Sequence, residues 1–334
     1  MSDVQDPTAL RAWLNHLGLD PVGVPVLERI GAGQSNLTFW VSDQSGRRWV
    51  LRRPPHGDLL GSAHDVLREA RIMAAIHGTA VPVPQVYGVL EDPPTVLMSC
   101  VEGVVLDDEA TIAAMPTDVR HAVGLSLART LAAVHDVDLD ATGLSGLASH
   151  APYAARQLRR WTRQWEQSRM RDLPALISLT ARLETSIPPQ HETTLVHGDG
   201  HLLNAVCEPG TGDVVALLDW ELSTLGEPLA DLGTLLAYWP QSGEPAMQHV
   251  TPSQHAGFAS REELVEVYAD TTGRDTSSIG FWHVLGLWKL AIIAEGVLRR
   301  TQELPGEAPH QELPRERIDT LVEHAHEVAS AAGI

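Results

Sequence analysis

Two residue types are scarce in this chain of 334 residues. Lysine occurs only once, at Lys289, so nearly all of the 24 basic side chains are arginines. Cysteine occurs twice, at Cys100 and Cys207, which argues against a disulfide framework. Asparagine is also rare, with three copies, so an asparagine inside a motif is more informative than a common residue.

Long apolar runs and a basic start are missing as well. No stretch approaches the roughly 18 apolar residues that a membrane-spanning helix needs. The first residues, MSDVQDP, are acidic and lack the basic and apolar regions of a signal peptide. Hydrophobic residues make up 43% of the chain, enough for ordinary globular cores. We therefore expect a cytoplasmic protein without a membrane partner.

Positive charge is in deficit, and the deficit is uneven. The net charge is −19; residues 1–103 hold 8 basic and 11 acidic side chains, so −16 falls on the rest. An acidic C-terminal part argues against a nucleic-acid partner, because phosphates would be repelled. The same charge suits a cationic substrate, although acidic surfaces also simply keep proteins soluble.

The order of elements predicts an α+β protein. Strand patterns cover 26–30, 37–42, 48–52, 95–100, 194–196 and 214–218, and helical periods cover 9–17, 64–77, 117–135, 151–170, 261–268, 281–300 and 315–331. Residues 81–86 read as extended because of their prolines. Glu102-Gly103 is a natural break, so we expect a sheet domain over 1–103 and a helical domain over 104–334.

The strongest motif is His197-Gly-Asp-Gly-His-Leu-Leu-Asn204, which follows an apolar strand. Phosphoryl transfer needs a carboxylate at the attacking hydroxyl and an oxygen ligand for Mg²⁺, and kinases place an Asp and an Asn five residues apart for these tasks. Asp199 and Asn204 have this spacing, and Asp219 follows the next apolar strand, as a metal-binding Asp does in kinases. A zinc site on His197 and His201 is less favoured, because flanking glycines disfavour the helix that would align them.

The segment Gly31-Ala-Gly-Gln-Ser-Asn36 lies between two predicted strands. Glycines there let backbone N–H groups approach phosphate oxygens. A dinucleotide fingerprint would require a third glycine at Asn36 and then a helix, whereas Leu37-Thr-Phe-Trp-Val reads as a strand. The pattern therefore favours a kinase-type glycine loop.

A third motif combines Arg52 with Glu69. Kinases use a basic residue of the third strand to hold donor phosphates and pair it with a helix glutamate. Lysine is usual there, but none exists before Lys289, so an arginine must serve. Val50 and Arg52 share one strand face and Arg53 the other. The alternative is two surface arginines on an edge strand.

Together these stretches resemble the aminoglycoside phosphotransferase and choline kinase superfamily, and most closely its bacterial branch related to the kinase-like domain fused to some acyl-CoA dehydrogenases. The resemblance runs through GAGQSNLTF, WVLRRPP, LVHGDGHLLN and VALLDWELSTLGEPLADLG. It implies a protein-kinase-like two-lobed fold, ATP or GTP as donor, Mg²⁺, and a small hydroxyl-bearing substrate. By this resemblance Asp199 is the catalytic base, Asn204 and Asp219 are metal ligands, and Asp231 braces the catalytic loop. Nucleotide contacts are expected at Gly31, Gly33, Ser35, Asn36, Arg52, Glu69, Met98 and Cys100.

Other functions stay open at this point. A catalytically impaired nucleotide-binding protein would share the fold, with Arg52 in place of lysine as its only support. A dinucleotide-dependent oxidoreductase would need a helix after Asn36, and a metal hydrolase would need a third ligand beside His197 and His201. The arginine-rich segment 156–171 favours a solvated basic helix with Trp161 and Trp165 packed inward, or contact with an anionic part of the substrate. The sequence does not select the acceptor.

Overall fold

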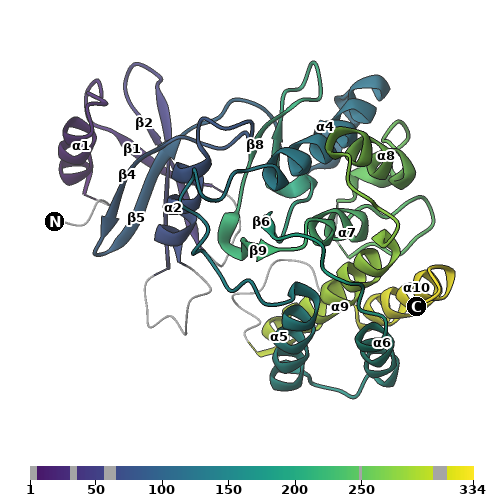
Figure 1. Cartoon of the computed structure of the whole chain (residues 1–334). Helices are drawn as coiled ribbons and strands as arrows, with labels where there is room; N and C mark the ends of the chain where they lie inside the picture. The colour runs from purple at the N-terminus through teal and green to yellow at the C-terminus, as the bar shows by residue number, and fades with distance from the viewer. Residues whose placement is uncertain (1–5, 31–35, 56–64, 248–249, 304–313) are drawn as a thin grey trace. The chain divides into compact units, whose positions relative to one another are not determined.

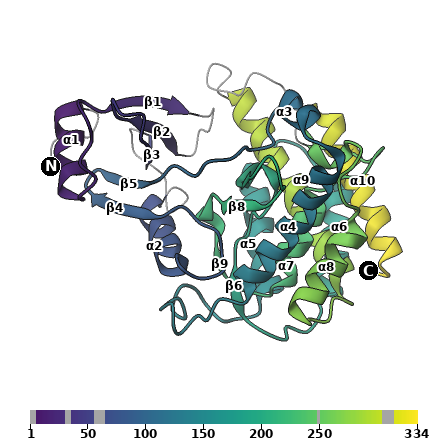
Figure 2. The same cartoon turned by 90° about the horizontal axis from the view of Figure 1, so that it is seen from above.

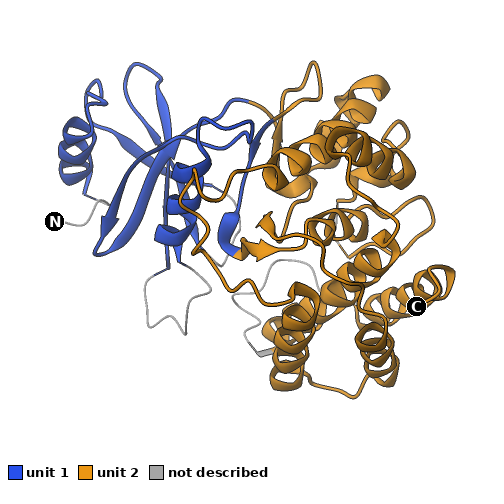
Figure 3. Cartoon of the chain, in the orientation of Figure 1, with its two compact units in different colours: residues 1–102, 215–221 blue, residues 103–214, 222–334 orange. Residues whose placement is uncertain are grey.

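The computed structural model describes residues 6–30, 36–55, 65–247, 250–303 and 314–334. The predicted glycine-loop residues Gly31, Gly33 and Ser35 lie outside the described residues. The chain divides into two compact units, coloured separately in Figure 3. Unit 1 contains residues 1–102 and 215–221, and unit 2 contains residues 103–214 and 222–334. No sequence signal separates 215–221 from the second domain that we predicted.

Unit 1 is built on a five-stranded antiparallel sheet (Figure 1), whose strand order β1-β2-β3-β5-β4 can be followed in Figure 2. Its strands are β1 (Val26–Ile30), β2 (Leu37–Ser42), β3 (Arg48–Arg53), β4 (Val86–Glu91) and β5 (Pro94–Ser99). The central strand β3 carries both Arg52 and Arg53, so the alternative of surface arginines on an edge strand is wrong. Arg53 is only 5% exposed and lies over the Phe39 ring.

One face of this sheet is covered by helix α1 (Pro7–His16). The helix begins with Asp6, whose carboxylate accepts the Thr8 N–H, and Pro7 needs no N–H bond in the first turn. Its apolar side chains and those of β2, β3 and β5 form a core of Leu10, Trp13, Leu14, Val41, Trp49, Leu51 and Leu97. Since strand side chains alternate between faces, Arg52 is directed away from this core.

Helix α2 (Val66–Ile76) contacts β4 and β5 and supplies Glu69. The Asp65 carboxylate caps it by accepting the Arg68 N–H. Burial of Ile72, Met73 and Ile76 fixes its orientation, and each such side chain contributes about 1.5–3 kcal/mol when removed from water. Glu69 is on the same buried side, with only 2% of its surface exposed.

Unit 2 is mainly helical. Its helices are α3 (Glu109–Ala114), α4 (Thr117–His135), α5 (Tyr153–Ser168), α6 (Pro174–Thr185), α7 (Leu229–Ala237), α8 (Arg261–Thr272), α9 (Ile279–Glu303) and α10 (Arg315–Ala331). A small antiparallel pair, β6 (Thr194–Val196) and β9 (Thr224–Gly226), precedes and follows the loop that carries the His197–Asn204 motif. The short strand β7 (Ala205–Cys207) follows the motif, whereas most of β8 (Val214–Leu217) belongs to the segment 215–221 of unit 1.

Helices α7 and α9 run side by side in unit 2 (Figure 2). A side chain at Gly233 would meet the Trp282 backbone at 2.3 Å, and one at Gly286 would meet the Gly233 carbonyl oxygen at 2.7 Å. The missing side chains therefore permit close backbone approach of the two helices. Helix α9 is also the one helix in the described residues that is long and apolar enough to cross a membrane by length and composition. However, 78% of its apolar window is buried inside the protein.

The sheet-then-helices order predicted from the sequence is confirmed, but some elements were missed. β4 begins at Val86, the last residue of the segment 81–86 that was predicted to be extended, and the strand over 86–91 was not predicted; α3, α6 and α7 had no prediction either. Helix α7 reads poorly from sequence because all nine of its residues are buried, so it shows no polar face and no helical period.

Candidate active site

The loop after β6 carries the strongest motif, and Asp231 of α7 holds its backbone. The Asp231 carboxylate accepts the His197 N–H at 2.5 Å and the Gly198 N–H at 2.7 Å. Gly198 has φ +84°, and a Cβ there would lie 2.7 Å from the Leu222 carbonyl oxygen. Glycine is therefore required at this turn.

Asp199 projects from this loop with 22% of its side chain exposed. The Asn204 Nδ2 group donates to the Asp199 backbone oxygen at 2.9 Å and to its carboxylate at 3.0 Å. The His201 imidazole lies 3.5 Å from the same carboxylate and stacks on Tyr238 with a centroid distance of 4.2 Å. Because Nδ2 faces Asp199, the Asn204 amide oxygen is the atom left for a cation.

The surroundings of Asp199 keep it ionised. Burial alone would raise the pKa of its carboxyl, but electrostatic interactions with His201, Lys289 and His197 outweigh burial and hold the pKa well below its usual range. A carboxylate that stays charged at neutral pH can accept a hydrogen bond from a hydroxyl at any physiological pH.

His197 and Gly200 serve the loop itself. His197 is completely buried, and its Nδ1 accepts the Asp199 N–H at 3.2 Å. A Cβ on Gly200 would lie 2.7 Å from the Leu131 side chain, so this glycine faces α4 and not an open pocket. Among the described residues, no three His, Cys, Asp or Glu side chains group to hold a metal ion, and the metal-hydrolase alternative gains no support.

His135 and Tyr268, which connect to Asp231 in this centre, were not singled out from the sequence. His135, at the end of α4, bonds Asp231 through Nε2 at 3.1 Å and Tyr268 of α8 through Nδ1 at 2.8 Å. The only sequence signal was the histidine in the last turn of the predicted helix 117–135. The network connects α4, α7 and α8 to the motif loop.

In unit 1 the arginine of β3 joins two carboxylates. The Arg52 Nη1 group donates to Glu69 at 2.8 Å, and Nη2 donates to Asp219 at 3.2 Å. The Trp220 N–H also reaches Glu69, at 3.3 Å. Asp219 has φ +64°, in the left-handed region, and keeps 32% of its side chain exposed.

The electrostatics of this trio are tightly coupled. Burial raises the pKa of Glu69 to about 7, with Arg52 opposing the rise and Asp219 adding to it. Burial lowers the pKa of Arg52, but Glu69 and Asp219 more than compensate, so its pKa is raised. Arg52 is therefore a permanent cation that balances a buried acid.

The remaining predicted nucleotide residues are spread over unit 1. Met98 lies on β5, 6% exposed and in register with Val50 of β3, and Cys100 is a partly exposed free thiol after β5. Asn36 precedes β2, and neither of its buried amide atoms has a bonding partner among the described residues.

The structure thus groups the predicted residues within each unit. Arg52, Glu69 and Asp219 contact one another in unit 1, and Asp199 contacts Asn204 in unit 2. Asn204 and Asp219 are oxygen donors of the kind that Mg²⁺ prefers, and both are partly exposed. The residue type and accessibility of each, taken in its own unit, fit the kind of ligand that a magnesium ion takes.

Residues 26–264 match the phosphotransferase enzyme family. The chain belongs to this family. It is also 35% identical, over 313 residues, to acyl-CoA dehydrogenase family member 10 of Mus musculus, covering 90% of this chain and 29% of that protein. The chain therefore spans less than a third of the length of this relative.

Solved structures show the same fold. A Ralstonia eutropha protein assigned to the aminoglycoside phosphotransferases is 29% identical, with a TM-score of 0.78 and 98% of each chain covered. An aminoglycoside phosphotransferase solved with GDP and kanamycin has a TM-score of 0.62, covers 98% of this chain and 99% of its own, and is 13% identical, so it bears on the fold alone. The predicted kinase-like fold and the predicted family are confirmed.

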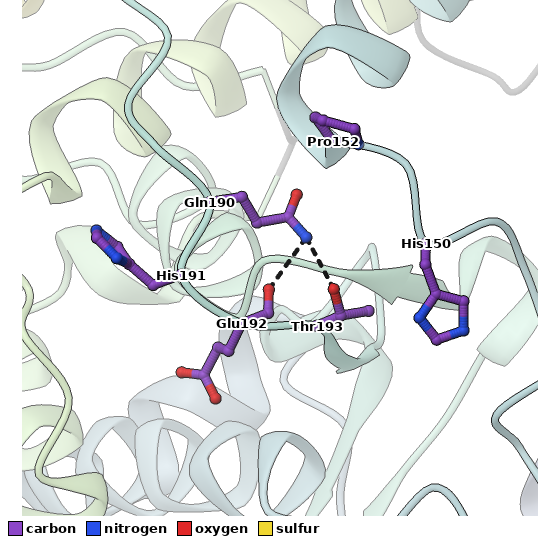
Figure 4. Close-up of a pocket in the computed structure, with 6 residues that line it drawn as sticks. All are labelled: His150, Pro152, Gln190, His191, Glu192 and Thr193. Atoms are coloured by element: carbon purple, nitrogen blue, oxygen red, sulfur yellow. Dashed lines mark hydrogen bonds between the residues drawn. The ribbon is translucent and has the colours of Figure 1, made fainter.

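A hollow at the surface of unit 2 contains none of the predicted site residues (Figure 4). It has a volume of about 420 Å³ and is lined by His150, Pro152, Gln190, His191, Glu192 and Thr193. Gln190 donates to the Glu192 backbone and to the Thr193 hydroxyl, as the dashed lines show. These bonds stabilise the loop before β6.

Some arginines of the segment 156–171 bond other parts of the protein, and others are exposed to solvent. Arg156 donates to the Leu225 carbonyl at 2.7 Å, and Arg171 pairs with Glu295 and Asp319. The tryptophans at 161 and 165 are each 5% exposed, so they pack inward as the sequence predicted. The arginines at 159, 160 and 163 are exposed on α5.

Proposed function

We propose that this phosphotransferase-family protein transfers the γ-phosphate of ATP or GTP to a hydroxyl group of a small acceptor, with Asp199 as the catalytic base. The observation that carries the proposal is the arrangement of Asp199: ionised, partly exposed, and fixed by Asn204 at 3.0 Å on a loop braced by Asp231. The GDP in the kanamycin-complexed phosphotransferase of the same fold supports a nucleotide as donor.

Asp199 orients the acceptor hydroxyl by accepting its hydrogen bond. As the acceptor oxygen bonds to the γ-phosphorus, the bond between that phosphorus and the bridging oxygen breaks, and its electron pair leaves with the nucleoside diphosphate. Asp199 takes the hydroxyl proton. Its low pKa makes it a weak base, so its contribution is mainly positioning, with proton transfer late in the reaction.

Arg52 is the residue that would bind the donor phosphates, and Glu69 fixes its guanidinium. Arg52 contacts Glu69 through Nη1 and Asp219 through Nη2, whereas its buried Nε–H has no hydrogen-bond partner among the described residues. A donor phosphate would therefore bond Nε or take the place of Asp219 at Nη2, since the guanidinium can bond several partners at once. Asn204 and Asp219 would hold Mg²⁺, which when bound neutralises negative charge on the phosphates.

Asp199→Asn tests the proposal. Nucleotide consumption is measured with pooled hydroxyl acceptors, including aminoglycosides, sugars and choline, for the wild type and the variant. General-base contributions are worth roughly 10²–10⁴-fold, so turnover should fall by about that factor while calorimetry shows unchanged nucleotide binding with Mg²⁺. Equal turnover would remove Asp199 from the base role. Nucleotide binding without any turnover in the wild type would instead favour the impaired-kinase alternative.

A further inference from the structure

Lys289 is the one lysine of the chain, and it lies in α9 against the motif loop. Its Nζ group donates to the Gly198 carbonyl oxygen at 2.7 Å. Gly198 directly precedes Asp199, the residue that the proposed function uses as base. In the proposed function Lys289 acts only through its charge, which helps to keep Asp199 ionised.

The Gly198 residue is held at both of its backbone polar groups. Asp231 of α7 accepts its N–H at 2.7 Å, and Lys289 of α9 donates to its C=O at 2.7 Å. The two helices approach closely at Gly233 and Gly286, two residues after Asp231 and three before Lys289. The Asp231 carboxylate and the Lys289 ammonium, from two neighbouring helices, thus bond the N–H and the C=O of the same residue, Gly198.

The charged groups around Lys289 match a positioning role. Asp199 and Asp231 favour its cationic form, whereas burial and Arg160 oppose it, and burial dominates, so its pKa is lowered. The ammonium also lies 5.3 Å from the centre of the Trp161 ring, which attracts a cation. In return Lys289 is one of the charges that hold Asp199 ionised.

The available space explains why lysine occupies this position in a chain that otherwise uses arginine. Lys289 lines a cavity of about 20 Å³ together with Trp161, Trp282 and Trp288. Such a cavity has room for about one water molecule. A compact ammonium fits at the Gly198 oxygen, whereas a planar guanidinium with five donors would need more space and more acceptors.

We infer that Lys289 is a positioning residue of the phosphotransfer centre. Its bond to the Gly198 carbonyl, together with the bond from the Gly198 N–H to Asp231, forms a clamp that fixes the peptide before Asp199 and so the direction of the Asp199 carboxylate. This inference rests on the proposed function for its catalytic consequence. The protection that the clamp gives to the backbone amides around Gly198 can be measured without turnover.

The test compares Lys289→Met, Lys289→Arg and the wild type, with Arg129→Met as control. Arg129 is an exposed cation on α4, so its variant removes one positive charge from unit 2 without touching the clamp. Amide hydrogen exchange is followed by mass spectrometry in peptides covering 195–203, α7 and α9. Loss of a charge-assisted bond should speed exchange in 195–203 by about tenfold or more in Lys289→Met, and not in the control.

Turnover gives the second readout. In Lys289→Met, kcat should fall by about 10–100-fold with the nucleotide KM unchanged. Lys289→Arg keeps the positive charge and should recover only part of kcat.

Three results would overturn the inference: unchanged exchange in 195–203, faster exchange spread equally over α7 and α9, or a loosened loop with wild-type kcat. If no acceptor is turned over by the wild type, the proposed function fails, but the exchange experiment still decides whether the clamp exists.

Discussion

Asp231→Asn should destabilise unit 2 strongly, because it alters the fully buried acceptor at the base of the motif loop. The carboxylate accepts two backbone N–H groups, from His197 and Gly198, and contacts the His135 imidazole at 3.1 Å. Asparagine keeps the shape, but its Nδ2 group donates. One of the three donors would then face another donor.

The expected loss follows from these bonds. A hydrogen bond to a charged group contributes about 1.5–3 kcal/mol, and a buried donor left without an acceptor costs about 1–3 kcal/mol. We therefore expect Asp231→Asn to lower the free energy of unfolding by about 2–5 kcal/mol. That is a large part of the roughly 5–15 kcal/mol that keeps a typical domain folded.

Urea unfolding followed by tryptophan fluorescence measures this loss, since five of the nine tryptophans lie in unit 2. Asp270→Asn is the matched control, because Asp270 is exposed on α8. A decrease below about 1 kcal/mol for Asp231→Asn, or one equal to that of the control, would refute the reasoning.

The pH dependence gives a further check. Burial raises the pKa of Asp231, but His135, His197 and the Gly198 N–H outweigh burial, so its pKa is lowered on folding. A lowered pKa stabilises the folded state above the unfolded value and loses this effect as the pH falls through the folded value. The difference in the free energy of unfolding between the wild type and Asp231→Asn should thus be constant from about pH 5 to 8 and become smaller in more acid solution. A gap that widens on acidification would contradict the assignment.

Three other predictions concern single contacts. Arg52→Ala should raise the nucleotide KM or lower kcat strongly, whereas Arg53→Ala should mainly reduce stability because Arg53 lies over Phe39. Arg52→Lys should keep activity unless the site requires the guanidinium plane. Equal small effects on kinetics from both alanine variants would contradict the role of Arg52 in binding the donor phosphates. Gly200→Ala should cost about 1–3 kcal/mol of unfolding free energy through overpacking against Leu131, and a second change, Leu131→Ala, should make its effect smaller in a double-mutant cycle. Because the pKa of Glu69 is raised to about 7, the folded state binds a proton that the unfolded state releases from about pH 4.5. The contribution of Glu69 to the free energy of unfolding should therefore be full below about pH 4.5 and be lost as the pH rises to about 7, and Glu69→Gln should lack that fall in urea midpoints. Parallel decreases in both proteins would show that Glu69 is not the source.

Much of the fold could be predicted from the sequence where local pattern decides structure. The helix over 117–135 and the strands over 26–30 and 37–42 agree with the structure at both ends, because their apolar periods and flanking turn residues are clear. β4 was missed because Gly88 and the following acidic residues weaken its strand pattern.

In the candidate site too, local contacts could be predicted from the sequence, whereas contacts between distant segments could not. The spacing of Asp199 and Asn204 is local, and the sequence was sufficient to place them side by side. The contacts of His135 and Lys289 with the motif depend on how α4, α7 and α9 pack, over separations that no local pattern encodes. Arg52 and Asp219 are 167 residues apart, and only analogy with kinases could associate them.

The discontinuity of unit 1 limits how this protein can be divided. Leu217 donates its N–H to the Pro82 carbonyl at 2.8 Å, and Asp219 and Trp220 contact the Arg52–Glu69 pair. A fragment that stops at residue 103 would leave Glu69 and Arg52 without these partners. The sheet of unit 1 is therefore not separable as a simple N-terminal segment, and a recombination junction placed at 103 would break the trio of charges unless residues 215–221 were transferred with it.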